Sequence, residues 1–225
     1  MAFSGRIHSL RAGLSAAYLI EAEGGWVLVD TGSPGQAGRI LSTLRALGGG
    51  RLRLIYITHA HFDHYGSARA LRQQTGAPIA IHAADEAAMA AGETPIRTVR
   101  GRGWLGRLLL PLAEWALRPE PIQADIILAD GQRMSAYGLD AVVMHTPGHT
   151  PGSSSLIVAD EVAFVGDLLV TTGCLHAQNL YASDWSQLAH SLARLKRRPL
   201  SRIYAGHGRR PASGAALQGL AIPSG

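Results

Sequence analysis

The 225-residue chain contains a single cysteine, Cys174, which excludes an intramolecular disulfide and a metal site built from several thiolates. It has no uninterrupted apolar run of about 18 residues, so we expect no membrane-spanning helix. Charged residues make up only 16% of the chain and hydrophobic residues 47%, a composition that excludes intrinsic disorder. At this length we expect one domain, residues 1–225, rather than two.

Lysine is almost missing, because Lys196 is the only one among 21 basic residues. The net charge is +5, and residues 185–225 contain no acidic side chain. Seven basic residues lie in that stretch: Arg194, Lys196, Arg197, Arg198, Arg202, Arg209 and Arg210. Such a patch is typical of a solvated surface or of one that binds phosphates. Between residues 194 and 210, where these basic residues lie, only Tyr204 could stack on a base, so we do not expect nucleic acid as a partner.

The N-terminal region has some features of a secretion signal, since two arginines precede an apolar run at residues 12–20. Acidic residues and Gly24-Gly25 follow at once, and a second apolar run covers residues 26–29. Two such runs around a Gly-Gly pair indicate a β-hairpin of strands 18–20 and 26–29. We therefore expect a cytoplasmic protein.

Short apolar strands and amphipathic helices alternate along the rest of the chain. The predicted strands are 52–58, 79–82, 126–128, 141–144, 156–158, 162–165 and 202–205. The predicted helices are 34–47, a helix to 75 capped by Asp63, 83–91, and a helix to 197 capped by Asp184. This alternation is typical of the α/β class.

Residues 92–121 interrupt the alternation with a strongly apolar stretch that includes Trp104, Trp115 and several leucines. We interpret it as a helical insertion, broken at Pro111. Side chains this apolar must bury against the body of the protein, another subunit or a ligand. We therefore expect the insertion either to pack in the core or against a second subunit of a homodimer, or to form a wall of a substrate pocket.

The sequence His59-Ala60-His61-Phe62-Asp63-His64 follows a predicted strand and leads into a helix. Residues at i and i+2 in an extended loop can direct two imidazoles into one space. Four nitrogen and oxygen ligands suit zinc, manganese or iron rather than a metal that prefers thiolates. The cluster predicts a metal site with either one ion or two ions that share the loop.

Three further residues that can bind metals lie just past apolar strands: His149, Asp167 and His207. A glycine precedes each of them, which allows the backbone to approach closely. Each is a weak signal alone, but their common setting indicates that they join the histidine cluster.

Together these motifs resemble the metallo-β-lactamase superfamily. The motifs are Asp30-Thr31-Gly32, Thr58–His64, Thr146–Gly152, Gly166-Asp167 and Gly206-His207-Gly208, in the order in which the family has them. The resemblance implies an αβ/βα four-layer sandwich of two mixed β-sheets flanked by helices, with the site at one edge of the sheets. It also implies that His59, His61 and His149 bind one metal, that Asp63, His64 and His207 bind a second, and that Asp167 bridges them. Asp30 would hold a ligand's ring or loop in place.

The resemblance further implies a metal-dependent hydrolase with two divalent ions, zinc first and manganese or iron as alternatives. A hydroxide bridging the ions would attack an ester, thioester or lactone of a small, partly apolar substrate. Asp63 is the candidate to receive or return a proton. The alternative is a phosphodiester hydrolase that uses the basic patch.

Departures from subfamily patterns narrow the substrate. Zinc β-lactamases have cysteine or serine where this chain has Asp167, so we do not expect antibiotic hydrolysis. Glyoxalase II-type thioesterases add a C-terminal helical domain, and only 18 residues follow His207, so we expect that domain to be absent. Many lactonases of the family have a tyrosine three residues after the bridging aspartate. Here that position is Val170, and Tyr181 is the nearest tyrosine after it.

Overall fold

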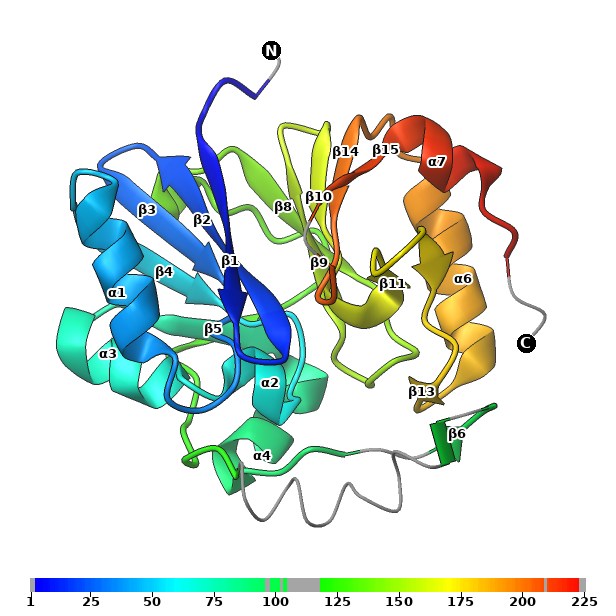
Figure 1. Cartoon of the computed structure of the whole chain (residues 1–225), viewed down its shortest axis with the longest axis horizontal. Helices are drawn as coiled ribbons and strands as arrows, with labels where there is room; N and C mark the ends of the chain where they lie inside the picture. Colours follow the sequence, from blue (N-terminus) through cyan, green and yellow to red (C-terminus); the bar gives the residue numbers. More distant parts are fainter. Residues whose placement is uncertain (1–2, 96–97, 102, 105–117, 209, 223–225) are drawn as a thin grey trace.

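The computed structural model describes residues 3–95, 98–101, 103–104, 118–208 and 210–222. Two mixed β-sheets form its centre (Figure 1). The first has the strand order β1 (Ile7–Ala12), β2 (Ser15–Ala22), β3 (Gly25–Val29), β4 (Leu52–Tyr56), β5 (Ile79–His82) and β7 (Ile126–Leu128). The second has the order β15 (Ala212–Ser213), β14 (Arg202–Tyr204), β10 (Val162–Phe164), β9 (Ser154–Val158) and β8 (Ala141–His145).

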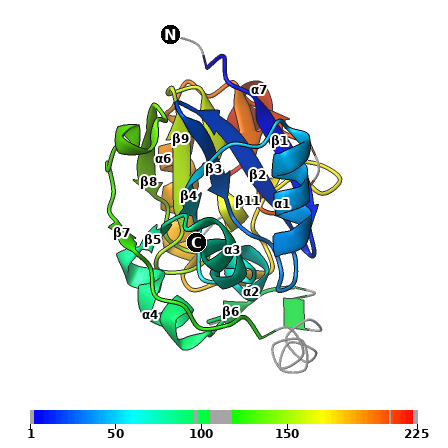
Figure 2. The same ribbon diagram turned by 90° about the vertical axis from the view of Figure 1, so that its left-hand side faces the viewer.

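Helices cover the outer face of each sheet (Figures 1 and 2). Beside the first sheet lie α1 (Ala37–Ala46), α2 (Phe62–Tyr65), α3 (Ala68–Thr75) and α4 (Ala83–Ala91). Beside the second lie α6 (Trp185–Lys196) and α7 (Gly214–Gly219). The predicted four-layer αβ/βα sandwich is confirmed. None of the helices in the described ranges is long and apolar enough to cross a membrane.

Short elements complete the described chain. The two-residue strand β6 (Thr98–Val99) pairs with β13 (Tyr181–Ala182), and β11 (Leu169–Val170) pairs with β12 (His176–Ala177). Two 3₁₀ turns cover Ser135–Tyr137 and Gly166–Leu168. The second of these turns directly follows β10 and carries Asp167, so it belongs to the site described below.

The core consists of three layers, because successive side chains of the central strands point to opposite faces of each sheet. Leu19 of β2 faces α1 and α3, whereas its neighbours Tyr18 and Ile20 face the second sheet. On the far side, Ile203 of β14 packs with Leu192 of α6. Because both faces of each sheet are covered, the central strands are almost wholly apolar and buried.

The predicted hairpin is confirmed as the antiparallel pair β2 and β3. The sequence did not predict β1, which pairs with β2 over the residues that had some features of a signal. The prediction that Asp63 caps a helix to residue 75 is wrong. Asp63 lies inside α2, whose N-cap residue is His61. That helix ends with Gly66 as its C-cap residue, and α3 begins as a separate helix. The Asp184 cap is right, since its carboxylate accepts from the backbone N–H of Gln187 at 2.9 Å.

Most of the predicted insertion at 92–121, including Trp115, lies outside the described residues. Its role as a wall or dimer contact stays a prediction, as does the single domain of residues 1–225. The described part approaches the site, because the side chain of Thr94 accepts from the backbone N–H of Phe62 at 3.0 Å. Trp104 is 58% exposed.

Candidate metal centre

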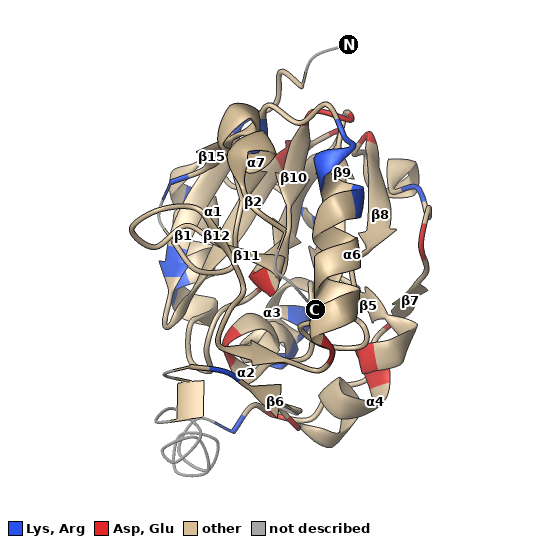
Figure 3. Ribbon diagram, turned by 90° about the vertical axis from the view of Figure 1, so that its right-hand side faces the viewer, with Lys and Arg blue, Asp and Glu red and all other residues tan. Residues whose placement is uncertain are grey.

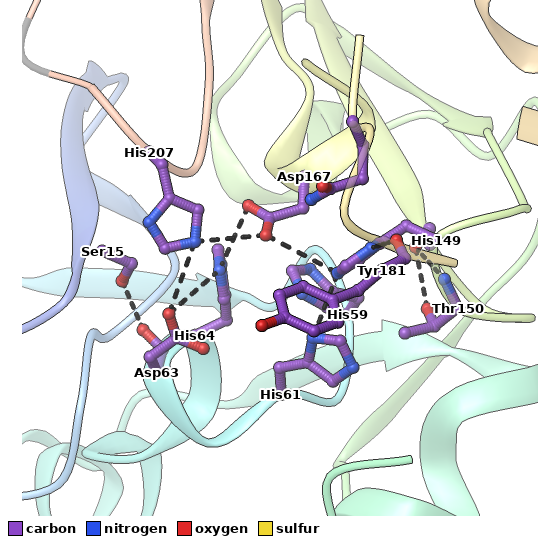
Figure 4. Close-up of polar contacts among 12 residues, drawn as sticks. Ser15, His59, His61, Asp63, His64, His149, Thr150, Asp167, Tyr181 and His207 are labelled. Carbon is purple, nitrogen blue, oxygen red and sulfur yellow. Dashed lines mark hydrogen bonds and ion pairs between the residues drawn. The ribbon is translucent and has the colours of Figure 1, made fainter. Parts of the chain in front are cut away.

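All seven predicted ligands come together at one edge of the two sheets (Figure 4). They lie on the loop and turn after β4 and on the segments after β8, β10 and β14. Ligand atoms of His59, His61 and His149 lie within 4.8 Å of one another, and we call these residues the histidine group. Ligand atoms of Asp63, His64 and His207 meet the same limit, and we call these the mixed group.

Asp167 lies between the two groups. One carboxylate oxygen is 3.6 Å from Nε2 of His149 in the histidine group and 3.1 Å from Nε2 of His207 in the mixed group. The other is 3.4 Å from Nε2 of His64. A single buried carboxylate therefore faces both groups. The bridging role that the family resemblance implies for it stays a prediction.

Glycine allows these segments to approach one another. A Cβ atom at Gly206 would overlap Oδ1 of Asp167 and the ring of His64. Gly148 has a φ of +132°, and a Cβ there would overlap the backbone at Leu188. Any other residue at these two positions would push His207 or His149 away from the cluster.

Each of the five histidines has one ring nitrogen on an oxygen acceptor outside the cluster. The pairs are His59 Nδ1 with Thr58 Oγ1 at 3.0 Å, His61 Nε2 with the carbonyl of Pro95 at 3.2 Å, His64 Nδ1 with Asp30 at 2.8 Å, His149 Nδ1 with the carbonyl of Tyr181 at 2.9 Å, and His207 Nδ1 with the carbonyl of Leu14 at 3.2 Å. Such a contact keeps a proton on the outer nitrogen and leaves the inner nitrogen able to bind a metal.

Several inner atoms lack a hydrogen-bond partner. These are Nε2 of His59, Nε2 of His64 and Oδ1 of Asp167, all fully buried. A buried polar atom without a partner is costly, and a metal ion is the partner that imidazole nitrogen and carboxylate oxygen would share. The donor set therefore fits divalent metal ions.

The histidine group is held in its neutral form. Burial lowers the pKa of His59 and His61, and it lowers that of His149 to about 4. Because a metal binds the unprotonated imidazole, this group is ready to bind at neutral pH.

The mixed group is the opposite case. The carboxylate of Asp167 raises the pKa of His207 to about 9. Burial lowers the pKa of His64, but the carboxylates of Asp63, Asp167 and Asp30 outweigh burial and raise it. Without a metal, protons on these imidazoles balance the clustered negative charge. Divalent ions would replace those protons.

Asp30 makes the contacts expected of it. One carboxylate oxygen accepts from Nδ1 of His64 at 2.8 Å and from the hydroxyl of Thr58 at 2.9 Å, and the other accepts from the backbone N–H of Thr58 at 2.8 Å. Thr58 in turn contacts His59, so Asp30 orients one imidazole directly and a second through that hydroxyl.

Asp85 is a functional candidate that the sequence did not reveal. It lies on α4 and is only 1% exposed. Its carboxylate accepts from the backbone N–H of Ala60 at 2.9 Å, the hydroxyl of Thr150 at 2.6 Å and the backbone N–H of Gly152 at 2.6 Å. It thus joins the loop of His59 and His61 to the loop of His149. An acidic residue in the first turn of a short helix looks like a surface residue, so no local pattern could have found it.

The sequence profile described as "Metallo-beta-lactamase superfamily" matches residues 10–207. The chain belongs to the metallo-β-lactamase superfamily. The match covers all seven clustered residues and Asp30. The predicted family is confirmed, and its fold together with the histidine and aspartate groups implies divalent metal ions.

Curated relatives with similar sequences are named as hydrolases. A hydroxyacylglutathione hydrolase of Pseudomonas aeruginosa is 31% identical over 192 residues, which are 81% of this chain and 60% of that protein. A probable metallo-hydrolase of Burkholderia pseudomallei is 30% identical with the same coverage. The chain thus spans about three fifths of the length of these relatives. Their names agree with the predicted class of enzyme.

Solved structures share the fold. The BLEG-1 B3 metallo-β-lactamase has a TM-score of 0.74 and 23% identity, with 94% of this chain and 95% of that chain covered. TTHA1623 in a di-iron-bound form has a TM-score of 0.68 and 25% identity, with 95% and 97% covered. The first likeness supports the fold alone.

Proposed function

We propose that this protein is a hydrolase with two divalent metal ions that cleaves an ester, thioester or lactone. The observation that carries the proposal is the position of Asp167, which faces both the histidine group and the mixed group. Seven clustered ligands are too many for one tetrahedral ion and suit two ions that share a carboxylate. His59, His61 and His149 would hold one ion, and Asp63, His64 and His207 the other.

When bound, the two ions would lower the pKa of water, supply hydroxide near neutral pH and stabilise negative charge on a substrate oxygen. The protein's own residues set the geometry. Asp30 and the carbonyl of Tyr181 orient His64 and His149, while Asp85 keeps two of the ligand loops together. These contacts give the site the rigidity that stabilising a transition state requires.

Asp63 is the residue we propose to move a proton. Its carboxylate lies 3.5 Å from Nε2 of His207 and 3.8 Å from Nε2 of His64, and the hydroxyl of Ser15 donates to its backbone carbonyl. The side chain is 11% exposed, so it lies at the edge of the cluster where a substrate can reach it. From there it can take a proton from the attacking water and return it to the leaving group.

Two observations favour a carbonyl substrate. The name of the Pseudomonas aeruginosa relative specifies hydroxyacylglutathione, which is a thioester. Tyr181 of β13 contacts His149 through its backbone, and its side chain extends toward the cluster (Figure 4). Val170, where many lactonases have a tyrosine, lies on β11 and bridges to His207 through its backbone. These contacts support the proposal that Tyr181 contacts a substrate carbonyl in place of Val170.

The basic patch gives only weak support to the alternative function as a phosphodiester hydrolase, because several of its cations already have partners (Figure 3). Arg194 pairs with Asp130 at 2.7 Å, and Arg198 pairs with Asp160 at 3.1 Å. Lys196 donates to the carbonyl of Leu220 at 2.6 Å. Three of its seven cations are therefore already engaged and would have to release their partners to hold phosphates.

The test is metal analysis of the purified protein combined with a substrate panel. We expect about two equivalents of zinc, with manganese or iron as the other outcomes, and cleavage of a thioester, an aryl acetate or a lactone. Removing the ions with a chelator should abolish activity, and adding them back should restore it. Saturation at one ion per chain, or hydrolysis of bis-p-nitrophenyl phosphate alone, would contradict the proposal.

A further inference from the structure

A cavity of about 980 Å³ is lined by several residues that contact the mixed group, although no residue of that group lines it. Ser15, whose hydroxyl donates to the backbone carbonyl of Asp63, forms part of its wall. Thr171, whose backbone N–H donates to the carbonyl of His207 at 2.8 Å, and Gly208 form another part. The cavity therefore shares its walls with the residues that position Asp63 and His207. A substrate attacked at the metal centre could place its far end here.

Three arginines line this cavity: Arg11 of β1, Arg39 of α1 and Arg210. They come from segments far apart in the sequence, and no aspartate or glutamate is among the lining residues. Within the described part of the chain, none of the three forms an ion pair with an acidic side chain, whereas Arg6, Arg69, Arg72, Arg194 and Arg198 all do. Three unbalanced cations around one hollow make a region of positive potential.

We propose that this cavity binds the anionic end of the substrate through Arg11, Arg39 and Arg210. The inference rests on the proposed function and adds the chemical class of the substrate, an acyl compound whose leaving group carries carboxylates or phosphates. Guanidinium groups suit both anions because their N–H donors match paired oxygens. Ser15 and Thr171 at the walls contact Asp63 and His207, so this anion site lies beside the mixed group.

The test uses one acyl group on three thiols. The acyl thioesters of glutathione and of coenzyme A carry carboxylates and phosphates respectively, and that of N-acetylcysteamine is neutral. We expect Arg11→Gln, Arg39→Gln and Arg210→Gln each to lower the ratio of kcat/KM for an anionic thioester to that for the neutral one by about 3- to 10-fold, chiefly through KM. Arg45→Gln, an exposed arginine on α1 that does not line the cavity, should leave that ratio unchanged.

The outcomes separate the sources of the anion. A smaller ratio for the glutathione thioester alone identifies a carboxylate site, and a smaller ratio for the coenzyme A thioester alone identifies a phosphate site. An unchanged ratio in all three variants would overturn the proposal. So would an equal loss on anionic and neutral thioesters, since that result would mean that the arginines act only through the fold.

A binding measurement keeps this inference separate from the proposed function. If the wild-type protein cleaves no thioester, the proposed function fails but the anion site can still be tested. Isothermal titration of the metal-loaded protein with S-methylglutathione and with S-methyl coenzyme A should then show binding that Arg39→Gln weakens and Arg45→Gln does not. Binding to neither compound, or equal binding by both variants, would overturn the anion site itself.

Discussion

The histidine group and the mixed group lie side by side, yet their electrostatic character is opposite. Burial keeps the three imidazoles of the histidine group neutral, whereas carboxylates around the mixed group favour protonated His64 and His207. The first group can bind a metal at once, and the second must first release protons. The difference indicates that two ions sharing Asp167 would be held unequally, more tightly by the histidine group near and below neutral pH.

The largest effect should come from removing the residue that both groups share. Asp167→Ala should lower kcat/KM by at least about 1000-fold. Both ions lose a ligand, and the site loses one of the two carboxylates that balance the charge of the ions. The fold should persist, since Asp167 lies beyond the end of β10 rather than in the core. Steady-state kinetics, metal analysis and thermal unfolding would check this. Wild-type turnover with both ions bound would rule out a bridging role.

Single-ligand variants should separate the two groups. His149→Ala removes one ligand of the histidine group and His207→Ala one of the mixed group, and each should lower bound metal toward one equivalent per chain. We expect His149→Ala to weaken the tighter site and His207→Ala the weaker one, with kcat/KM reduced by about 100-fold or more in both. Elemental analysis after dialysis would measure this. If each variant lost both ions together, the groups would not be independent sites.

Asp85, a buried carboxylate outside the ligand set, should affect the histidine group. Asp85→Asn should lower metal affinity of the histidine group about 10- to 100-fold, because Asp85 holds the loops of His61 and His149 together. Glu86→Gln, on the same helix but only partly buried, is the matched control. Metal competition with a chromophoric chelator gives the affinities. An Asp85→Asn protein with normal affinity at both groups would show that Asp85 serves only the fold.

Acidification should produce the smallest but most selective effect. The pKa of His207 is raised to about 9, so protons compete with metal at the mixed group throughout the range below that value. The pKa of His149 is lowered to about 4, so the histidine group meets such competition only near pH 4. Metal titrations of the metal-free protein between about pH 8 and pH 5.5 should therefore show falling affinity at the mixed group first. If metal affinity fell in parallel at both groups, the proposed electrostatic difference between the histidine group and the mixed group would be wrong.

The parts of the fold that the sequence predicted well are those with strong local periodicity. The strands after residue 50 are short apolar runs between turn residues, and most of their predicted bounds agree with the structure to within a residue or two. The helix from Asp63 was misjudged because the metal motif itself supplies the first turn. α2 ends at Tyr65, and Ser67 leaves the helical conformation before α3 begins, so a single helical periodicity does not extend across residues 63–75.

For the candidate site, the sequence by itself determined the residue types and their places at strand ends. Histidine and aspartate after apolar strands, with glycine before three of them, were sufficient to predict the seven clustered residues. Only the tertiary structure decided that Asp167 faces both groups, that buried Asp85 joins two ligand loops, and that three arginines surround one cavity. These contacts join residues tens of positions apart. Their proximity depends on strand order and sheet packing, which no local pattern of side chains encodes.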